Sequence, residues 1–329
     1  MDFDQPVTGS SVWKGPEVAN DPAWIYRLNR QEIAELDSAI AAARRSGATL
    51  PDLTRDKFKL PKLAPAIRQW MRDLNYGRGF MLVRGFPVSR YSKEDAAIAY
   101  WAIGRHMGDP VPQSRDGDLL GHVRDTGELA TNPGVRLYRT TKRQDFHTDG
   151  SDIVGLLCLR RAKSGGLSQI ASSPAVFNEI QKRRPDLIPL LFEPMYWDSG
   201  GEHRADEKPY WTAPICKLIN DRLRFLYLGW YIRDAQRHPD VPRLTRAQGE
   251  VMELIESIAN DPAFRLDMDF EPGDIQFLKN STILHCRTEY TDFDDPDLKR
   301  HLLRLWLTAY EFEDGDASLR QGFSGKFAK

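Results

Sequence analysis

Two histidines and an aspartate, His147, Asp149 and His285, are side chains of the types that bind iron in oxygenases. Two imidazoles and one carboxylate can occupy one face of an Fe(II) ion and leave its other coordination positions open for a co-substrate and dioxygen. His147 and Asp149 are separated by a single residue, so in an extended segment their side chains point to the same side. These two residues can therefore hold one ion together.

The third ligand must come from elsewhere in the chain, which contains seven histidines. His285 ends the stretch 273–285, which is typical of two short apolar strands joined by a Lys-Asn-Ser turn, and functional groups often lie at strand ends. His238 and Asp240 form a competing His-x-Asp pair. The proline between them and the neighbouring arginines and proline are typical of a solvated connector, so we favour His147, Asp149 and His285.

Arg304 lies within the apolar run 300–307. Strand alternation places Leu302, Arg304 and Trp306 on one face and three leucines on the other. An unpaired charge buried in such a strand would cost several kcal/mol, so the guanidinium needs an anion. A dicarboxylate such as 2-oxoglutarate can chelate iron through its C1 carboxylate and keto oxygen and offer its C5 carboxylate to an arginine. For the arginine alone, a structural salt bridge remains the alternative.

Five stretches together resemble the taurine dioxygenase and 2,4-dichlorophenoxyacetate dioxygenase family of Fe(II)- and 2-oxoglutarate-dependent enzymes. The resemblance extends from about residue 60 to 312, and the combination is specific although no single stretch is. The stretches are residues 79–86 (GFMLVRGF), 146–150 (FHTDG), 165–168 (GGLS), the segment that ends at His285, and 300–304 (RHLLR).

The resemblance implies a role for each site residue. It implies that the iron ligands are His147, Asp149 and His285. It also implies that Arg304 holds the distal carboxylate of 2-oxoglutarate, helped by the hydroxyl of Ser168. Arg300 is the rival for the arginine role, because the loop after His285 is longer here than in the taurine enzyme. We favour Arg304 because it lies inside the apolar strand, and we interpret Asn280 as a turn residue.

The resemblance further implies hydroxylation of an unactivated C–H bond of a small molecule, with O2 consumed and succinate and CO2 released. A halogenase of the same fold is disfavoured because such enzymes lack the carboxylate ligand that Asp149 supplies. A Jumonji-like protein hydroxylase usually holds 2-oxoglutarate with a lysine, so Arg304 favours a small-molecule substrate. A non-catalytic, cupin-like metal-binding barrel is the non-enzyme alternative.

Capping residues and hydrophobic periodicity predict helices and strands around these motifs. Tyr138, Arg139, Lys142 and Arg143 precede the metal motif and could face the substrate or form a solvated basic strand. Helices are expected over residues 31–45, 92–107 and 245–260 and after Ser173-Pro174, and strands over 119–124, 153–160 and 167–172.

These elements indicate an α+β chain with a mainly β core. The family resemblance implies a double-stranded β-helix, which is a cupin-like jelly roll, with helices packed around it. We expect a flexible N-terminal arm over residues 1–21 and one domain over 22–329, since residues 147, 149, 285 and 304 must converge. Residues 172–240, with four aromatic residues that are more often core, would form an insertion on the substrate side: Trp197, Trp211, Trp230 and Tyr231.

Composition agrees with an ordinary cytoplasmic enzyme. The 329 residues are 41% hydrophobic, and the net charge of -1 gives no sign of a nucleic-acid or membrane partner. Three cysteines without a Cys-x-x-Cys motif fit a reducing compartment. No secretory signal or membrane-spanning run is visible. The expected partner is a small molecule, for which an anion is one option; homo-oligomerisation is left open.

Overall fold

The computed structural model describes residues 5–114, 116–129, 135–201, 203 and 206–312. Its largest sheet has seven strands in the order β1-β2-β14-β6-β17-β3, with β4 also paired to β17. All of these pairings are antiparallel except β1 with β2. The strands are β1 (Ile25–Arg27), β2 (Phe80–Arg84), β3 (Gly108–Pro110), β4 (Leu120–Val123), β6 (Ile153–Arg160), β14 (Ile275–Lys279) and β17 (His301–Ala309).

A second, four-stranded sheet has the order β13-β8-β15-β5 and is antiparallel throughout. Its strands are β5 (Gln144–His147), β8 (Ser168–Ser172), β13 (Arg265–Met268) and β15 (Ile283–Arg287). Three two-stranded ribbons complete the β structure: β9 (Met195–Asp198) with β10 (Tyr210–Ala213), β11 (Cys216–Ile219) with β12 (Arg222–Phe225), and β7 (Ser164–Gly165) with β16 (Tyr290–Thr291).

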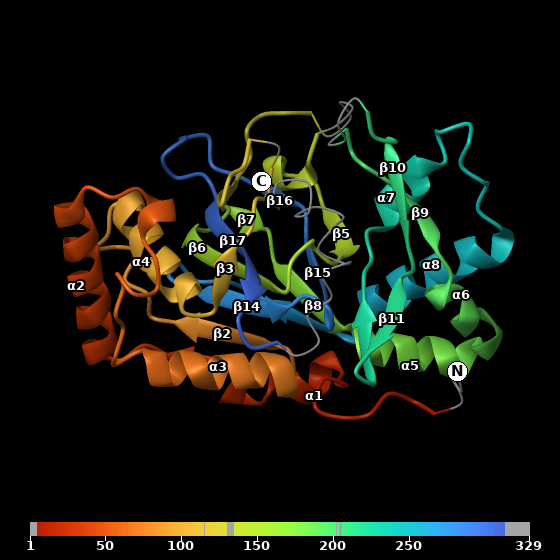
Figure 1. Ribbon diagram of the computed structural model, residues 1–329, viewed down its shortest axis with the longest axis horizontal. Helices are drawn as coiled ribbons and strands as arrows, with labels where there is room; N and C mark the ends of the chain where they lie inside the picture. The colour runs from red at the N-terminus through yellow and green to blue at the C-terminus, as the bar shows by residue number, and fades with distance from the viewer. Residues whose placement is uncertain (1–4, 115, 130–134, 202, 204–205, 313–329) are drawn as a thin grey trace.

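Strand β17 is buried on both faces, which explains its nearly continuous apolar sequence. Leu302 and Trp306 point into a core that also contains residues of the smaller sheet. Leu303, Leu305 and Leu307 point the other way, into a second core that contains residues of three helices. These are α2 (Arg30–Ser46), α3 (Ala64–Tyr76) and α4 (Lys93–Arg105), which lie along the outer side of the large sheet (Figure 1). The predicted alternation is therefore confirmed.

Helices α5 (Ser173–Arg183) and α8 (Arg246–Asn260) pack together beside the smaller sheet (Figure 1). The predicted helices begin where capping residues were expected: Ser92 accepts from the Asp95 N–H, and Thr245 forms a capping box with Gln248. The shorter helices are α1 (Gly15–Ala19), α6 (Ile188–Phe192) and α7 (Gly229–Ala235), with 3-10 turns at Pro22–Trp24, Leu50–Asp52, Leu137–Arg139 and Pro185–Leu187.

The N-terminal segment differs from the flexible arm expected over residues 1–21. Trp13 is 4% exposed, its ring lies 5.0 Å from that of Phe80, and its Nε1 donates to the Arg78 carbonyl. Gly15 lies so close to the Arg265 carbonyl that a Cβ would be 1.7 Å from its oxygen. The backbone of Val7 also bonds to the Asn178 side chain, so several contacts dock this polar stretch. Residues 1–4 lie outside the described part.

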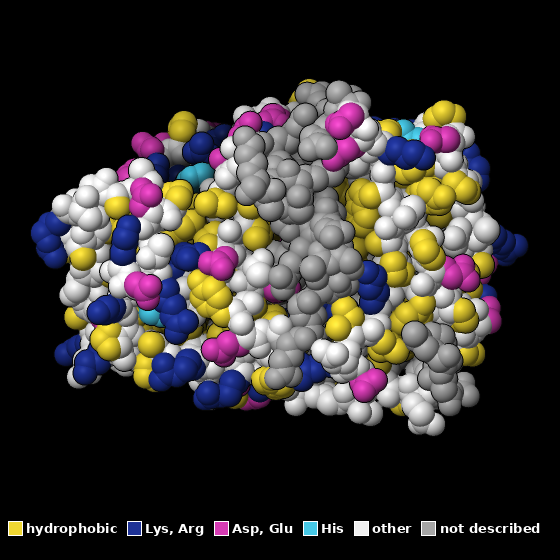
Figure 2. Space-filling model, in the orientation of Figure 1, with side chains coloured by type: hydrophobic (Ala, Val, Ile, Leu, Met, Phe, Trp, Pro, Cys, Tyr) yellow, Lys and Arg dark blue, Asp and Glu magenta, His cyan; other side chains and the backbone are white. Residues whose placement is uncertain are grey.

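The surface in Figure 2 carries Lys and Arg side chains interspersed with Asp and Glu, as the net charge of -1 suggests. The three cysteines are buried and form no disulfide. In the described ranges, every helix is too short or too polar to cross a membrane.

Candidate metal centre and co-substrate cavity

The structure brings together the three residues that the sequence singled out as metal ligands. Strands β5 and β15 pair so that His285 lies directly opposite His147, and Asp149 follows two residues after β5 ends. Each residue offers a ligand atom, and these atoms all lie within 4.8 Å of one another. Asp149 lies between the imidazoles, with Oδ1 3.8 Å from Nε2 of His147 and Oδ2 3.5 Å from Nε2 of His285.

Asp149 is held by Trp306 of β17, which contacts its carboxylate, and by Asn280, which contacts the backbone around it. The Trp306 indole N–H donates to its Oδ2 at 2.9 Å. Asn280, in the turn between β14 and β15, accepts from the Asp149 backbone N–H at 2.7 Å and donates to the carbonyls of Asp149 and Ser151. Asn280 is therefore more than the turn residue that the sequence predicted, because it clamps both sides of the loop that carries Asp149.

His147 is also positioned by its neighbours. Nδ1 of His147 lies 2.7 Å from the Asp145 carbonyl, and its Nε2 lies 3.1 Å from the Gln144 side-chain amide. A carbonyl at Nδ1 fixes the tautomer that leaves Nε2 free as a ligand. Buried Nε2 atoms and a carboxylate form a donor set that suits Fe(II), so these residues fit the metal implied by the sequence.

Burial and the neighbouring charges set the protonation states of His147 and Asp149. Burial, helped by the adjacent His285, lowers the pKa of His147 to about 3. Burial alone would raise the pKa of Asp149, but the hydrogen bond from His285 and the positive charge of Arg304 outweigh it, so the pKa lies below its usual range. At neutral pH His147 is therefore neutral and Asp149 ionised, which are the forms that bind a metal.

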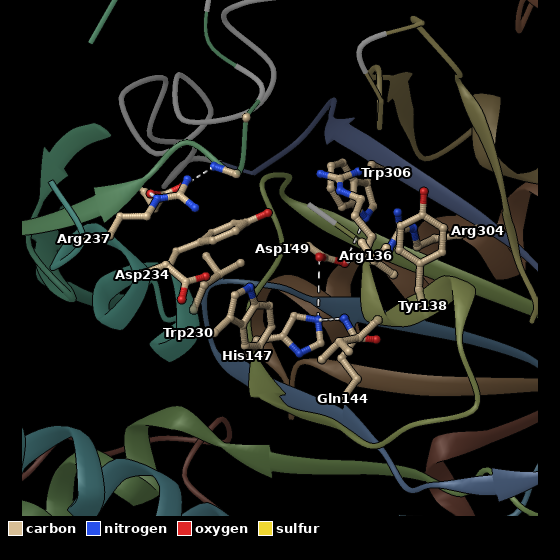
Figure 3. Close-up of a pocket in the computed structure, with 17 residues that line it drawn as sticks. Arg136, Tyr138, Gln144, His147, Asp149, Trp230, Asp234, Arg237, Arg304 and Trp306 are labelled. Atoms are coloured by element: carbon tan, nitrogen blue, oxygen red, sulfur yellow. Dashed lines mark hydrogen bonds and ion pairs between the residues drawn. The ribbon is translucent and has the colours of Figure 1, made fainter. Parts of the chain in front are cut away.

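An open cavity of about 620 Å³ lies in front of His147 and Asp149. Figure 3 shows Trp230 and Asp234 on one side of this cavity and Arg136 and Tyr138 on the other. The Trp230 ring lies 5.1 Å from the His147 ring. Part of the wall, including Trp230 and Tyr231 of α7, comes from the segment 172–240, which the sequence predicted on the substrate side.

A narrower inner cavity of about 40 Å³ continues from the metal cluster into the barrel. Its wall includes Ser168 of β8, Arg287 of β15, Arg300, and apolar side chains of both sheets. Five residues line both cavities, so the two meet at the cluster: Tyr138, Gln144, His147, Asp149 and Arg304.

The two candidate arginines lie at different depths. Arg304 lines both cavities, and its Nη1 is 4.0 Å from Oδ2 of Asp149. Its Nε donates to Gln113 at 2.7 Å, and its guanidinium lies over the Tyr138 and Trp306 rings. Arg300 lines only the inner cavity of the two. It is 5% exposed, and its Nη1 has no hydrogen-bond partner among the described residues.

Several residues weighed from the sequence lie away from the cluster. Nε2 of His238 lies 2.8 Å from Oδ2 of Asp198. The metal cluster formed by the described residues contains neither His238 nor Asp240. The basic residues before the metal motif contact other partners: Arg139 lies near Glu128, Lys142 pairs with Glu289, and Arg143 donates to Asn260. Tyr138, in contrast, lines both cavities.

Sequence reasoning missed the site roles of Gln113, Asn280 and Trp306. Trp306 had a usable signal, because it shares a strand face with Arg304. Gln113 had none, because its contact with Arg304 joins residues 191 apart in the chain.

Replacing Asn280 with alanine is expected to lower the free energy of unfolding by about 2 to 4 kcal/mol, because it leaves a buried N–H and two buried carbonyls unpaired. Urea unfolding measures this loss. Asn280→Asp is the matched variant: it keeps the acceptor for the Asp149 N–H but cannot donate to the two carbonyls. An alanine variant as stable as wild type would contradict the clamp.

The comparisons with known proteins agree with this geometry. Residues 45–306 match the family model "Taurine catabolism dioxygenase TauD, TfdA family". The chain is 30% identical over 312 residues to FR-33289 synthase of Streptomyces rubellomurinus, covering 92% of this chain and 90% of the relative. It is 32% identical over 308 residues to the taurine hydroxylase-like protein SAT17 of Stachybotrys chartarum, covering 89% of this chain and 77% of the relative.

The solved structure of an asparagine oxygenase superposes with a TM-score of 0.68 at 15% identity, covering 87% of this chain and 93% of that chain. The non-haem iron oxygenase OrfP superposes with a TM-score of 0.62 at 16% identity, covering 86% and 94%. These likenesses confirm the predicted double-stranded β-helix with its mixed α+β composition. The chain therefore belongs to the taurine catabolism dioxygenase TauD, TfdA family, as an Fe(II)- and 2-oxoglutarate-dependent dioxygenase.

Proposed function

We propose that His147, Asp149 and His285 hold the Fe(II) of this dioxygenase. The observation that carries the proposal is the convergence of two imidazoles and one carboxylate at the junction of two cavities. When bound, Fe(II) and 2-oxoglutarate supply the oxidising chemistry, in which a substrate C–H bond is hydroxylated by O2 and the co-substrate is converted to succinate and CO2. The Trp306 and Asn280 contacts keep Asp149 in place for the metal.

2-Oxoglutarate would lie across the junction of the two cavities, with its chelating end at the metal cluster and its distal carboxylate in the inner cavity, so that the two arginines would face opposite ends of it. Arg304, beside Asp149, would face the end that binds the metal. Arg300 and Ser168, deeper in the cavity, would hold the distal carboxylate. This reverses the order favoured from sequence. The reason is the position of each arginine. Arg304 lies 4.0 Å from the proposed ligand Asp149, so it is too close to the metal cluster to reach the far end of a 2-oxoglutarate that is chelated there.

The outer cavity would hold the substrate. Arg136 and Asp234 bring opposite charges to its two sides, and Trp230 and Tyr138 supply aromatic faces that exclude water (Figure 3). The asparagine oxygenase was solved with hydroxyasparagine, and OrfP with hydroxy-arginine. We therefore propose an amino acid or a related small zwitterion, whose anionic group faces Arg136.

A succinate assay tests this proposal. The protein with Fe(II), O2 and ascorbate should release succinate slowly from 2-oxoglutarate alone, faster with the right substrate, and not with N-oxalylglycine, which copies the chelate but is not decarboxylated. A panel of amino acids, sulfonates and aryloxyacetates separates the substrate classes. Stimulation by non-amino acids alone would overturn the zwitterion assignment, and succinate equal to a metal-free control would overturn the metal assignment.

A further inference from the structure

A third arginine of the inner cavity, Arg287, lines it together with Arg300 and Arg304. It lies two residues after His285 on β15, so its side chain points to the same side of the strand as that histidine. Arg300 immediately precedes β17. The two side chains reach the same cavity from different sheets, and both are buried, with exposed fractions of 6% and 5%.

The two guanidiniums lack an ion-pair partner in the described part of the chain. Nε and Nη1 of Arg287 and Nη1 of Arg300 are buried without any hydrogen-bond acceptor there. Nη2 of Arg287 donates to the Lys142 carbonyl, which is neutral. Asp292 hydrogen-bonds to Arg300, but through the Arg300 backbone N–H and not through the guanidinium. Two buried positive charges are thus left to be balanced.

The Tyr290 ring lies beside both guanidiniums, 4.8 Å from Arg287 and 5.1 Å from Arg300. A cation–π contact contributes on the order of 0.5–2 kcal/mol, whereas a buried unpaired cation costs several kcal/mol. The ring therefore positions the two arginines but does not neutralise them. An anion that fits a narrow cavity next to the metal cluster is what the pair lacks.

We propose that Arg287 is a second guanidinium ligand of the distal carboxylate of 2-oxoglutarate, acting with Arg300. This rests on the proposed function, in which that carboxylate enters the inner cavity. A carboxylate has two oxygens and about four acceptor positions, enough for donors from two arginines. The consequence is a co-substrate site that selects dicarboxylates: a 2-oxoacid with an uncharged far end would leave both guanidiniums buried and unpaired.

The test compares two ligands that differ only at the far end. 2-Oxopentanoate has the chain length of 2-oxoglutarate but carries a methyl group where 2-oxoglutarate has the distal carboxylate. Dissociation constants of both are measured by anaerobic calorimetry on the Fe(II)-loaded protein. Arg287→Met, which keeps an apolar stem, should raise the constant for 2-oxoglutarate about tenfold to a hundredfold. The constant for 2-oxopentanoate should stay unchanged or fall.

Two outcomes with Arg287→Met overturn the proposal. If 2-oxoglutarate binds as in wild type, Arg287 does not contact it. If both oxoacids weaken equally, Arg287 acts through the fold or the metal. Arg161→Met is the control, because Arg161 is an exposed arginine paired with Asp269 and should change neither constant.

Two further measurements keep the proposal testable if Arg287→Met does not fold. Arg287→Lys keeps the charge but loses the planar fork, and should weaken 2-oxoglutarate selectively and by less. In wild type, two arginines predict that 2-oxoglutarate binds at least about a thousandfold more tightly than 2-oxopentanoate. A ratio of the two affinities near tenfold would contradict the proposal that both arginines bind the distal carboxylate. Failure of wild type to bind 2-oxoglutarate at all would instead refute the proposed co-substrate cavity.

Discussion

Asp149→Ala is expected to abolish stoichiometric Fe(II) binding while the protein stays folded. Asp149 lies between the two imidazoles, and its removal leaves only the imidazoles as ligands and takes away the negative charge that faces the ion. Loss of an outer partner of a metal site costs about tenfold to a hundredfold in affinity, and loss of a ligand should cost more. Anaerobic Fe(II) titration by calorimetry measures the affinity, and circular dichroism checks the fold.

His238→Ala is the control for this prediction. His238 belongs to the other His-x-Asp pair in the chain and binds Asp198 instead of the metal cluster. The His238→Ala protein should therefore bind Fe(II) with the affinity of wild type. An Asp149→Ala protein that binds Fe(II) as wild type does, or a His238→Ala protein that loses it, would contradict the assignment of the ligands.

Arg300→Leu is expected to weaken 2-oxoglutarate binding by about 2 to 4 kcal/mol, because the distal carboxylate would be buried without its charged partner. The same variant should bind 2-oxopentanoate no worse than wild type, since that ligand has no distal carboxylate. Arg304→Leu should behave differently and weaken both oxoacids, because Arg304 lies beside Asp149 where the shared chelating end would bind. Anaerobic calorimetry with both ligands measures the four affinities.

The reverse pattern would contradict the assignment of Arg300 to the distal carboxylate and of Arg304 to the chelating end. If Arg304→Leu affects 2-oxoglutarate alone and Arg300→Leu affects both ligands or neither, the arginine favoured from sequence is the distal anchor. The two variants thus serve as controls for each other, since each removes one buried guanidinium of the same cavity.

The choice between these arginines shows where sequence reasoning stops. Strand alternation correctly placed Arg304 and Trp306 on the inner face of β17. Alternation says nothing about depth along the barrel, and four residues of a strand span about 13 Å. Whether Arg300 or Arg304 lies beside the metal depends on how β17 is registered against β6 and β4, which is a tertiary property.

Local signals, in contrast, predicted the elements well. The apolar run 153–160 is β6, and Thr245 begins α8 as its capping motif predicted. The His-x-Asp motif and His285 meet because β5 and β15 are neighbours in one sheet, although His285 lies in the middle of β15 and not at the strand end that the sequence predicted. The partners that support the site, such as Gln113 for Arg304, come from distant loops, and no local pattern marks them.

The N-terminal segment is a second case in which a tertiary contact was not predictable from the local sequence. Its polar, glycine-containing sequence is typical of a free arm, yet Trp13 inserts beside Phe80 and Gly15 packs against the Arg265 backbone. Backbone hydrogen bonds of Val7 with Asn178 and of Ser11 with Ser172 add to these two contacts. Composition averages over the segment and misses them.

The most direct test of the central claim is the absorption spectrum of the protein with Fe(II) and 2-oxoglutarate under anaerobic conditions. Chelation of Fe(II) by a 2-oxoacid at this site should produce a weak visible charge-transfer band that saturates at one equivalent of each and is absent in Asp149→Ala. Zinc, which has a filled d shell, should give no band in the same cavity. The absence of a band in wild type at saturating Fe(II) and 2-oxoglutarate, or an equal band in Asp149→Ala, would contradict the site described here.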